Sequence, residues 1–82
     1  MKIGDKLLKT LSKRYEPEST IDQRFGRYDL TFRTDEDGNP VMLFIGNRDE
    51  NGRIAGNRFI RVIIRDSAGN VLKDHWDAKG RV

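Results

Sequence analysis

The sequence predicts an α+β fold in which one N-terminal amphipathic helix packs on an antiparallel four-stranded meander. Apolar residues near the N-terminus recur at helical spacing, and the apolar period changes to two after residue 25. An Asp-x-x-Gly pattern then separates the predicted strands, which is typical of short antiparallel connections. The chain has 82 residues, a length that predicts a single domain over residues 1–82.

The helix is predicted over residues 3–15. Its apolar side chains form one stripe, and its lysines fall on nearly the opposite side of the helical wheel, where a solvated surface explains them. Glu16 and Pro17 end the helix, because a residue before proline is pushed out of the helical region. Residues 18–22 are expected to form a connector. The apolar stripe consists of Ile3, Leu7, Leu8, Leu11 and Tyr15, and the lysines are Lys2, Lys6, Lys9 and Lys13.

Period-two patterns and β-branched residues predict the strands. Tyr28, Leu30 and Phe32 alternate with polar residues, as in a strand with one buried face. The run after Pro40 is continuously apolar, and the next run is rich in Ile and Val, which favour strands. The predicted strands cover residues 27–33, 41–47, 58–65 and 71–76.

The Asp-x-x-Gly pattern predicts turns, because Asp caps its own backbone and Gly accepts the positive φ that such a turn requires. It occurs at Asp35–Gly38, Asp49–Gly52, Asp66–Gly69 and Asp77–Gly80. The first three copies lie between predicted strands, and the fourth either begins another turn or ends the fold. The middle connection is open to two interpretations: a long hairpin with a bulge near Gly46 or Gly56, or an open loop over residues 49–57.

Composition excludes several chemistries. The chain has no cysteine, which removes thiol catalysis, cysteine-based zinc sites and disulfide scaffolds. Neither a membrane-spanning apolar run nor a signal peptide is present, so we expect a cytoplasmic protein without membrane contact. We predict no metal and no cofactor: residues 35–39 suit a hairpin turn, and the calcium-loop pattern fails because Pro40 stands where that pattern needs glycine.

The two faces of the predicted sheet carry the functional hypotheses. One face is expected to take the helix and to hold Tyr28, Leu30, Phe32, Val41, Leu43, Ile45, Ile60, Val62, Ile64, Leu72 and Trp76. The other face is expected to gather large apolar side chains and arginines, although the two faces could be exchanged. A solvated face normally lacks such a cluster, which indicates a contact surface. The predicted binding residues are Met42, Phe44, Phe59, Ile63, Arg33, Arg61 and Arg65.

Three interpretations of that second face remain. In the leading one it contacts a second copy of the chain or another protein, so the molecule is a small non-enzymatic interaction or self-assembly module and a homo-oligomer is expected. In the alternative, the aromatic rings stack on nucleic-acid bases while Arg33, Arg61 and Arg65 bind phosphates. In the last, the sheet curls toward a small barrel and the face is internal.

Candidate catalytic residues are few, and we predict none. His75 is the only histidine, and we expect it on the solvent side of its strand, with Asp74 and Asp77 directed to the opposite face. No nucleophile is paired with a base in the sequence. A remote alternative is a histidine-poor ribonuclease of the toxin type, whose candidate residues are Arg61, Lys79, Arg81 and Tyr28.

Overall fold

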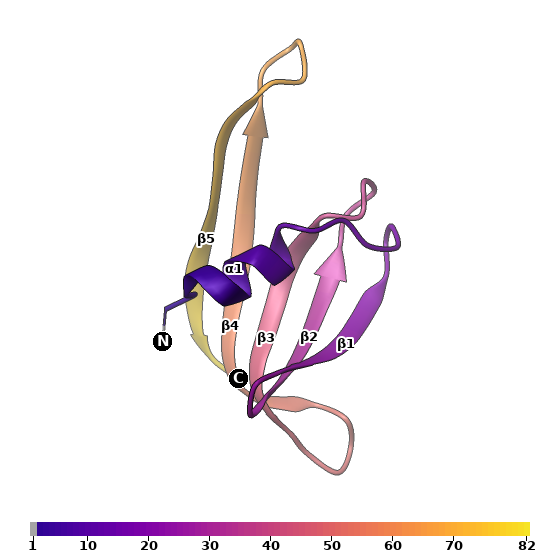
Figure 1. The fold of residues 1–82 in the computed structure, drawn as a ribbon, viewed down its shortest axis with the longest axis vertical. Coiled ribbons are helices and arrows are strands. Elements are labelled where there is room, and N and C mark those ends of the chain that lie inside the picture. The colour runs from indigo at the N-terminus through magenta and orange to yellow at the C-terminus, as the bar shows by residue number, and fades with distance from the viewer. Residues whose placement is uncertain (1) are drawn as a thin grey trace.

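The computed structural model describes residues 2–82 and shows one short helix lying across a five-stranded antiparallel sheet (Figure 1). Neighbouring strands in the sheet follow the chain order β1-β2-β3-β4-β5, so the sheet is a meander. This confirms the α+β class and the antiparallel meander, whereas the expected number of four strands is wrong. The elements are α1 (Asp5–Leu11), β1 (Thr20–Phe25), β2 (Tyr28–Thr34), β3 (Pro40–Arg48), β4 (Ile54–Arg65) and β5 (Val71–Arg81).

The additional strand is β1, which occupies part of the expected connector. It pairs with β2 in the register Ile21↔Phe32 and Phe25↔Tyr28. Only Gly26 and Arg27 separate the two strands, and Gly26 has a φ of 61°, as a two-residue hairpin turn requires. Along β1 exposed and half-buried residues alternate, with Ile21 and Phe25 among the half-buried ones.

The helix is shorter than the predicted range 3–15. After Leu11 the chain tightens: the Ser12 amide bonds to the Lys9 carbonyl at 3.3 Å, and the Ser12 hydroxyl donates to the Leu8 carbonyl at 2.7 Å. Such bonds close a helix end, so the last predicted turn does not form. Tyr15 still packs inward, with its ring 4.9 Å from that of Phe32.

The core lies between α1 and one face of the sheet. Leu7 and Leu11 point down from the helix onto buried side chains from three strands. Partly buried groups at the ends of the helix and sheet, including Trp76, complete this layer. A single short helix therefore covers the centre of one face only. The buried sheet residues are Leu30 and Phe32 in β2, Leu43 and Ile45 in β3, and Phe59 in β4.

Three Asp-x-x-Gly turns form as predicted. In each, the Gly amide bonds to the Asp carbonyl at 3.1 Å, and the Asp side chain accepts from the amides two and four residues later. The middle turn joins β3 and β4 in the long hairpin of the first interpretation, and β4 begins at Ile54, so the open loop over 49–57 is wrong. The pairing of β3 with β4 has no register shift, so the bulge expected near Gly46 or Gly56 in this hairpin is also wrong. The fourth copy lies inside β5, where the register with β4 shifts.

The β4–β5 hairpin is longer than its neighbours and projects beyond the sheet as a two-stranded arm (Figure 1). Pairing of β3 with β4 reaches only Met42↔Ile60, whereas pairing of β4 with β5 continues to Arg65↔Val71. Leu72, expected in the core, is 67% exposed at the end of this arm. Among residues 2–82, no helix has the length and apolar character to cross a membrane.

The faces of β4 are the reverse of those predicted. Because Leu43 pairs with Phe59 and Met42 with Ile60, Phe59 lies on the helix side and Ile60 on the opposite side. Alternation carries Arg61 and Ile63 to the helix side, and Val62 and Ile64 to the other. A register shift of one residue moves every side chain of a strand to the opposite face of the sheet. Because β4 is apolar on both faces, its sequence does not show which alternate residues face the helix; we call this choice the phase of β4.

Candidate interaction surface

The sheet face opposite α1 carries a patch of large apolar side chains, which we call the open face. Met42 and Phe44 of β3 lie beside Ile60 and Val62 of β4, and all four are half-buried. Within residues 2–82 no secondary-structure element covers them (Figure 1). The open face is defined by these four residues together with Arg33 and Arg58.

Cross-strand pairing brings the arginines next to the apolar patch. Arg33 of β2 pairs with Met42, which in turn pairs with Ile60. One layer further along, Phe44 pairs with Arg58. Residues directly opposite on one face have Cβ atoms about 5 Å apart, so each arginine stem lies against an apolar neighbour.

Only part of the predicted binding set lies on this face. Met42, Phe44 and Arg33 are there, as expected. The other predicted residues, Phe59, Ile63, Arg61 and Arg65, belong to β4 and lie on the helix side because of its phase. Phe59 is 4% exposed and belongs to the core, so placing it on the contact surface was wrong.

Arg61 is bound internally. Its Nε and Nη2 donate to the two carboxylate oxygens of Asp74, each at 2.7 Å, and its Nη1 donates to the carbonyls of Leu11 and Pro40, each at 3.2 Å. The guanidinium also lies 5.8 Å from the centre of the Trp76 ring. The hydrogen bonds and charge of Arg61 hold the pKa of Asp74 below its usual range. This arginine therefore links α1, β3 and β5.

Three residues on this surface, Arg58, Ile60 and Val62, were missed by sequence reasoning, and Arg58 is the charged one. Its Nε is buried and has no hydrogen-bond partner within the described chain. Leaving a buried N–H of a charged group unpaired costs free energy. Arg58, Ile60 and Val62 are alternate residues of β4 and therefore lie on one face. A correct prediction of the phase of β4 would have placed all three on this surface.

The end of the open face near the β3–β4 turn is polar and internally bonded. Arg48 donates to the hydroxyl of Thr31 at 3.1 Å and to the carbonyls of Leu30 and Gly52 at 3.0 and 2.9 Å, and it lies 3.5 Å from a carboxylate oxygen of Asp22. Beside it is a hollow of about 330 Å³, whose lining is mostly apolar. The hollow is bounded by Thr31, Phe44, Gly52, Arg53, Ile54 and Val82.

His75 lies on the same side of the sheet as the open face, because it pairs with Val62. Its Nε2 lies 3.2 Å from the Asp77 carboxylate. The expectation that both neighbouring acids point away from His75 is wrong for Asp77, because residues two apart in a strand share a face.

The candidate ribonuclease residues are dispersed, with Arg61 bound to Asp74 and the Tyr28 hydroxyl accepting from Arg27 at 3.2 Å.

Comparison of the chain with protein-family models, with curated proteins and with solved structures finds no match. The functional hypothesis therefore depends on the surfaces of this molecule alone.

Proposed function

We propose that this protein is a small, non-enzymatic self-assembly module that binds a second copy of itself through the open face. The observation that carries the proposal is the uncovered patch of Met42, Phe44, Ile60 and Val62. A contiguous apolar patch of this kind on a small polar protein is typical of an association surface. A second copy would remove it from water and enlarge a core that one short helix leaves small.

The charges around the patch favour a copy of the same chain. Both signs of charge occur on the side of the sheet away from α1. The cations are Arg33, Arg58 and Lys73, and the acids are Asp22 and Asp77. In a two-fold symmetric dimer the same patch meets itself, so a face that carries both signs can pair its own charges across the axis. A carboxylate of the second copy would also pair with the charge of the Arg58 guanidinium beside the patch.

The test is the oligomeric state of a matched pair of variants in sedimentation equilibrium. Ile60→Asp places a carboxylate at the centre of the patch, and Leu72→Asp makes a similar change at an exposed position outside it. We expect the native chain and Leu72→Asp to dimerise at micromolar concentration and Ile60→Asp to stay monomeric with unchanged circular dichroism. A native chain that is monomeric at about 100 µM contradicts the proposal.

A second candidate function is single-stranded nucleic-acid binding by the same face. The specific observation in its favour is the pairing of Phe44 with Arg58, which sets an aromatic ring beside an arginine. Stacking of a base on Phe44 and a phosphate on Arg58 or Arg33 would use both groups.

Nucleic-acid binding predicts an affinity for single-stranded RNA or DNA that falls steeply with salt. Arg58→Gln should weaken binding more than Arg14→Gln, which changes an exposed arginine near the helix end. Fluorescence anisotropy with labelled oligonucleotides measures both. The absence of binding at low salt, or equal effects of the two substitutions, contradicts this second candidate.

A further inference from the structure

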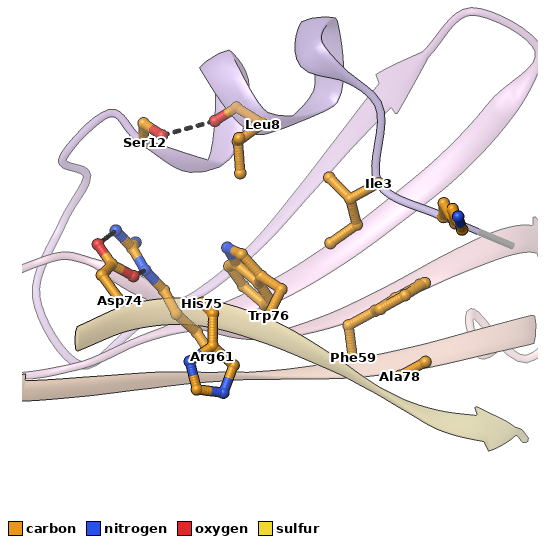
Figure 2. A pocket seen from close by; sticks show the side chains of 10 residues that line it. Ile3, Leu8, Ser12, Phe59, Arg61, Asp74, His75, Trp76 and Ala78 are labelled. Atoms are coloured by element: carbon orange, nitrogen blue, oxygen red, sulfur yellow. Dashed lines mark hydrogen bonds and ion pairs between the residues drawn. The ribbon is translucent and has the colours of Figure 1, made fainter.

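A groove of about 550 Å³ lies on the helix side of the sheet, between α1 and the β4–β5 hairpin. Figure 2 shows Ile3 and Leu8 pointing from the N-terminal segment and helix toward Trp76 and Phe59 on the strands. The Arg61–Asp74 ion pair lies along the same side, and His75 points away to the other face of β5 (Figure 2). The groove is thus separated from the open face by the thickness of the sheet.

The apolar lining is exposed because α1 is short. The helix covers the centre of the sheet with Leu7 and Leu11, while Leu8 lies over the groove and is 41% exposed. Trp76 packs only partly against the core. Tryptophan is one of the side chains that binding hot spots favour, and the exposed Leu8 extends the apolar surface beside it.

The charges beside the groove are mainly positive. Lys2 lines it at one end, and the charge of Arg61 is already neutralised by Asp74. A second hollow adjoins the groove, since both contain Leu8 and Ser12, and it carries Lys9 and Lys13 with Asp5. These lysines are exposed, so at low salt they would attract an acidic ligand to the groove.

The outer side of β5 is an unpaired sheet edge. β5 is the last strand of the sheet, and within residues 2–82 no other strand pairs with that edge. Its residues Asp74, Trp76 and Ala78 line the groove. An edge strand presents backbone N–H and C=O groups to an incoming strand, so hydrogen bonding and apolar contact are offered side by side.

We propose that this groove binds an extended acidic peptide segment of another protein, which adds to β5 as a sixth strand. Apolar side chains at alternate peptide positions pack on Leu8 and Trp76, and the intervening or flanking carboxylates lie near Lys2, Lys9 and Lys13. This surface is distinct from the open face, so peptide binding and self-association through the open face are separate properties of the molecule.

Trp76 is the only tryptophan of the chain and reports directly on the groove. The probe is a short capped peptide in which leucines alternate with glutamates, titrated into the protein at low salt while the tryptophan emission is followed. We expect a saturable change in emission. A matched peptide with lysines in place of glutamates should not bind, and a peptide with N-methylated backbone amides should lose binding because it cannot complete the strand pairing.

Variants locate the site. Leu8→Gln and Lys9→Gln should each weaken the acidic peptide severalfold, up to about tenfold, whereas Leu72→Gln, outside the groove, should not change the affinity. Lys9 is exposed, so its substitution is not expected to affect folding, which a thermal melt verifies. Unchanged emission up to about 1 mM peptide overturns the proposal. Equal binding of the lysine peptide overturns the acidic specificity, and equal binding of the N-methylated peptide overturns strand addition.

Discussion

Replacing Arg61 by methionine tests whether one arginine holds the helix, the sheet and the arm together. The substitution keeps an unbranched apolar stem and removes the guanidinium, whose nitrogens make two bonds of 2.7 Å to Asp74 and two of 3.2 Å to the carbonyls of Leu11 and Pro40. The Arg61 side chain is only 10% exposed, so solvent does not replace these bonds freely.

The expected loss of unfolding free energy depends on how buried Arg61 and Asp74 are. Breaking a buried ion pair costs about 3–5 kcal/mol, because the remaining charge is left without a partner. The Asp74 side chain is 36% exposed and regains water when the guanidinium is removed, which lowers the cost. We therefore expect Arg61→Met to lose about 2 kcal/mol of unfolding free energy, or a melting temperature lower by roughly 8–16 °C for a domain of this size.

The measurement is urea unfolding at several pH values, with Arg65→Met as the control because Arg65 is exposed and donates one 3.5 Å bond to the Gly69 carbonyl. The pKa of Asp74 is lower in the folded protein than in the unfolded chain, chiefly because of its bonds to Arg61. The pair therefore stabilises the fold above about pH 4, and this contribution disappears as the pH falls through the folded pKa.

The difference between the native chain and Arg61→Met should consequently shrink in acid. A loss no larger than that of Arg65→Met refutes the structural role of Arg61. A difference that stays constant from neutral to strongly acidic pH refutes the assignment of the effect to the Asp74 carboxylate.

Two further predictions concern packing and the turns. Leu11→Ala, at a fully buried helix position, should cost about 2–5 kcal/mol in denaturant unfolding, and a cost below 1 kcal/mol would contradict its place in the core. Gly38 and Gly69 have φ values of 83° and 88°, but a Cβ would contact the Tyr15 carbonyl oxygen only at Gly38. Gly38→Ala should therefore lower the melting temperature more than Gly69→Ala, and equal shifts would contradict this contact.

The turns were the most predictable part of the chain, because their chemistry is local. In the turn that begins at Asp35, burial alone would raise the pKa of the carboxyl, but bonds from the backbone amides of Asn39 and Asp37 and from the Asn39 side chain, together with the charge of Arg61, outweigh it, so the pKa of Asp35 is lowered. Aspartate at the first position and glycine at the fourth encode such a turn without any tertiary contact. The helix and the four predicted strands were located for a similar reason: the helix and β2 have a clear apolar period, and β3 and β4 contain continuous apolar or β-branched runs.

The phase of β4 and the strand β1 could not be fixed in that way. Phe59 and Ile60 are both large and apolar, and only pairing with Leu43 and Met42 decides which of them enters the core. A strand that is apolar on both faces specifies its register weakly until its neighbours are placed. β1 has only Ile21 and Phe25 as apolar residues, and it becomes a strand because β2 offers it an edge.

The candidate surfaces, too, could be predicted only in part from the sequence. An uncovered apolar face was predictable from the surplus of apolar residues over what one helix can cover. Its membership changed with the phase of β4: Arg58, Ile60 and Val62 replaced Arg61, Phe59 and Ile63. The helix-side groove was not foreseen, because it depends on where α1 stops and on the exposure of Leu8 that results.

The projecting arm divides the molecule into regions of unequal local stability. Beyond Arg61 the two strands of the arm have no third strand beside them, and a lone two-stranded ribbon is marginally stable in water. Its amides should therefore exchange with solvent through openings that cost less than global unfolding. The Arg61–Asp74 bridge crosses from β4 to β5 where the arm leaves the body, so we expect fraying that starts at the tip, near Asp66–Gly69, to stop there and leave the core beneath α1 closed.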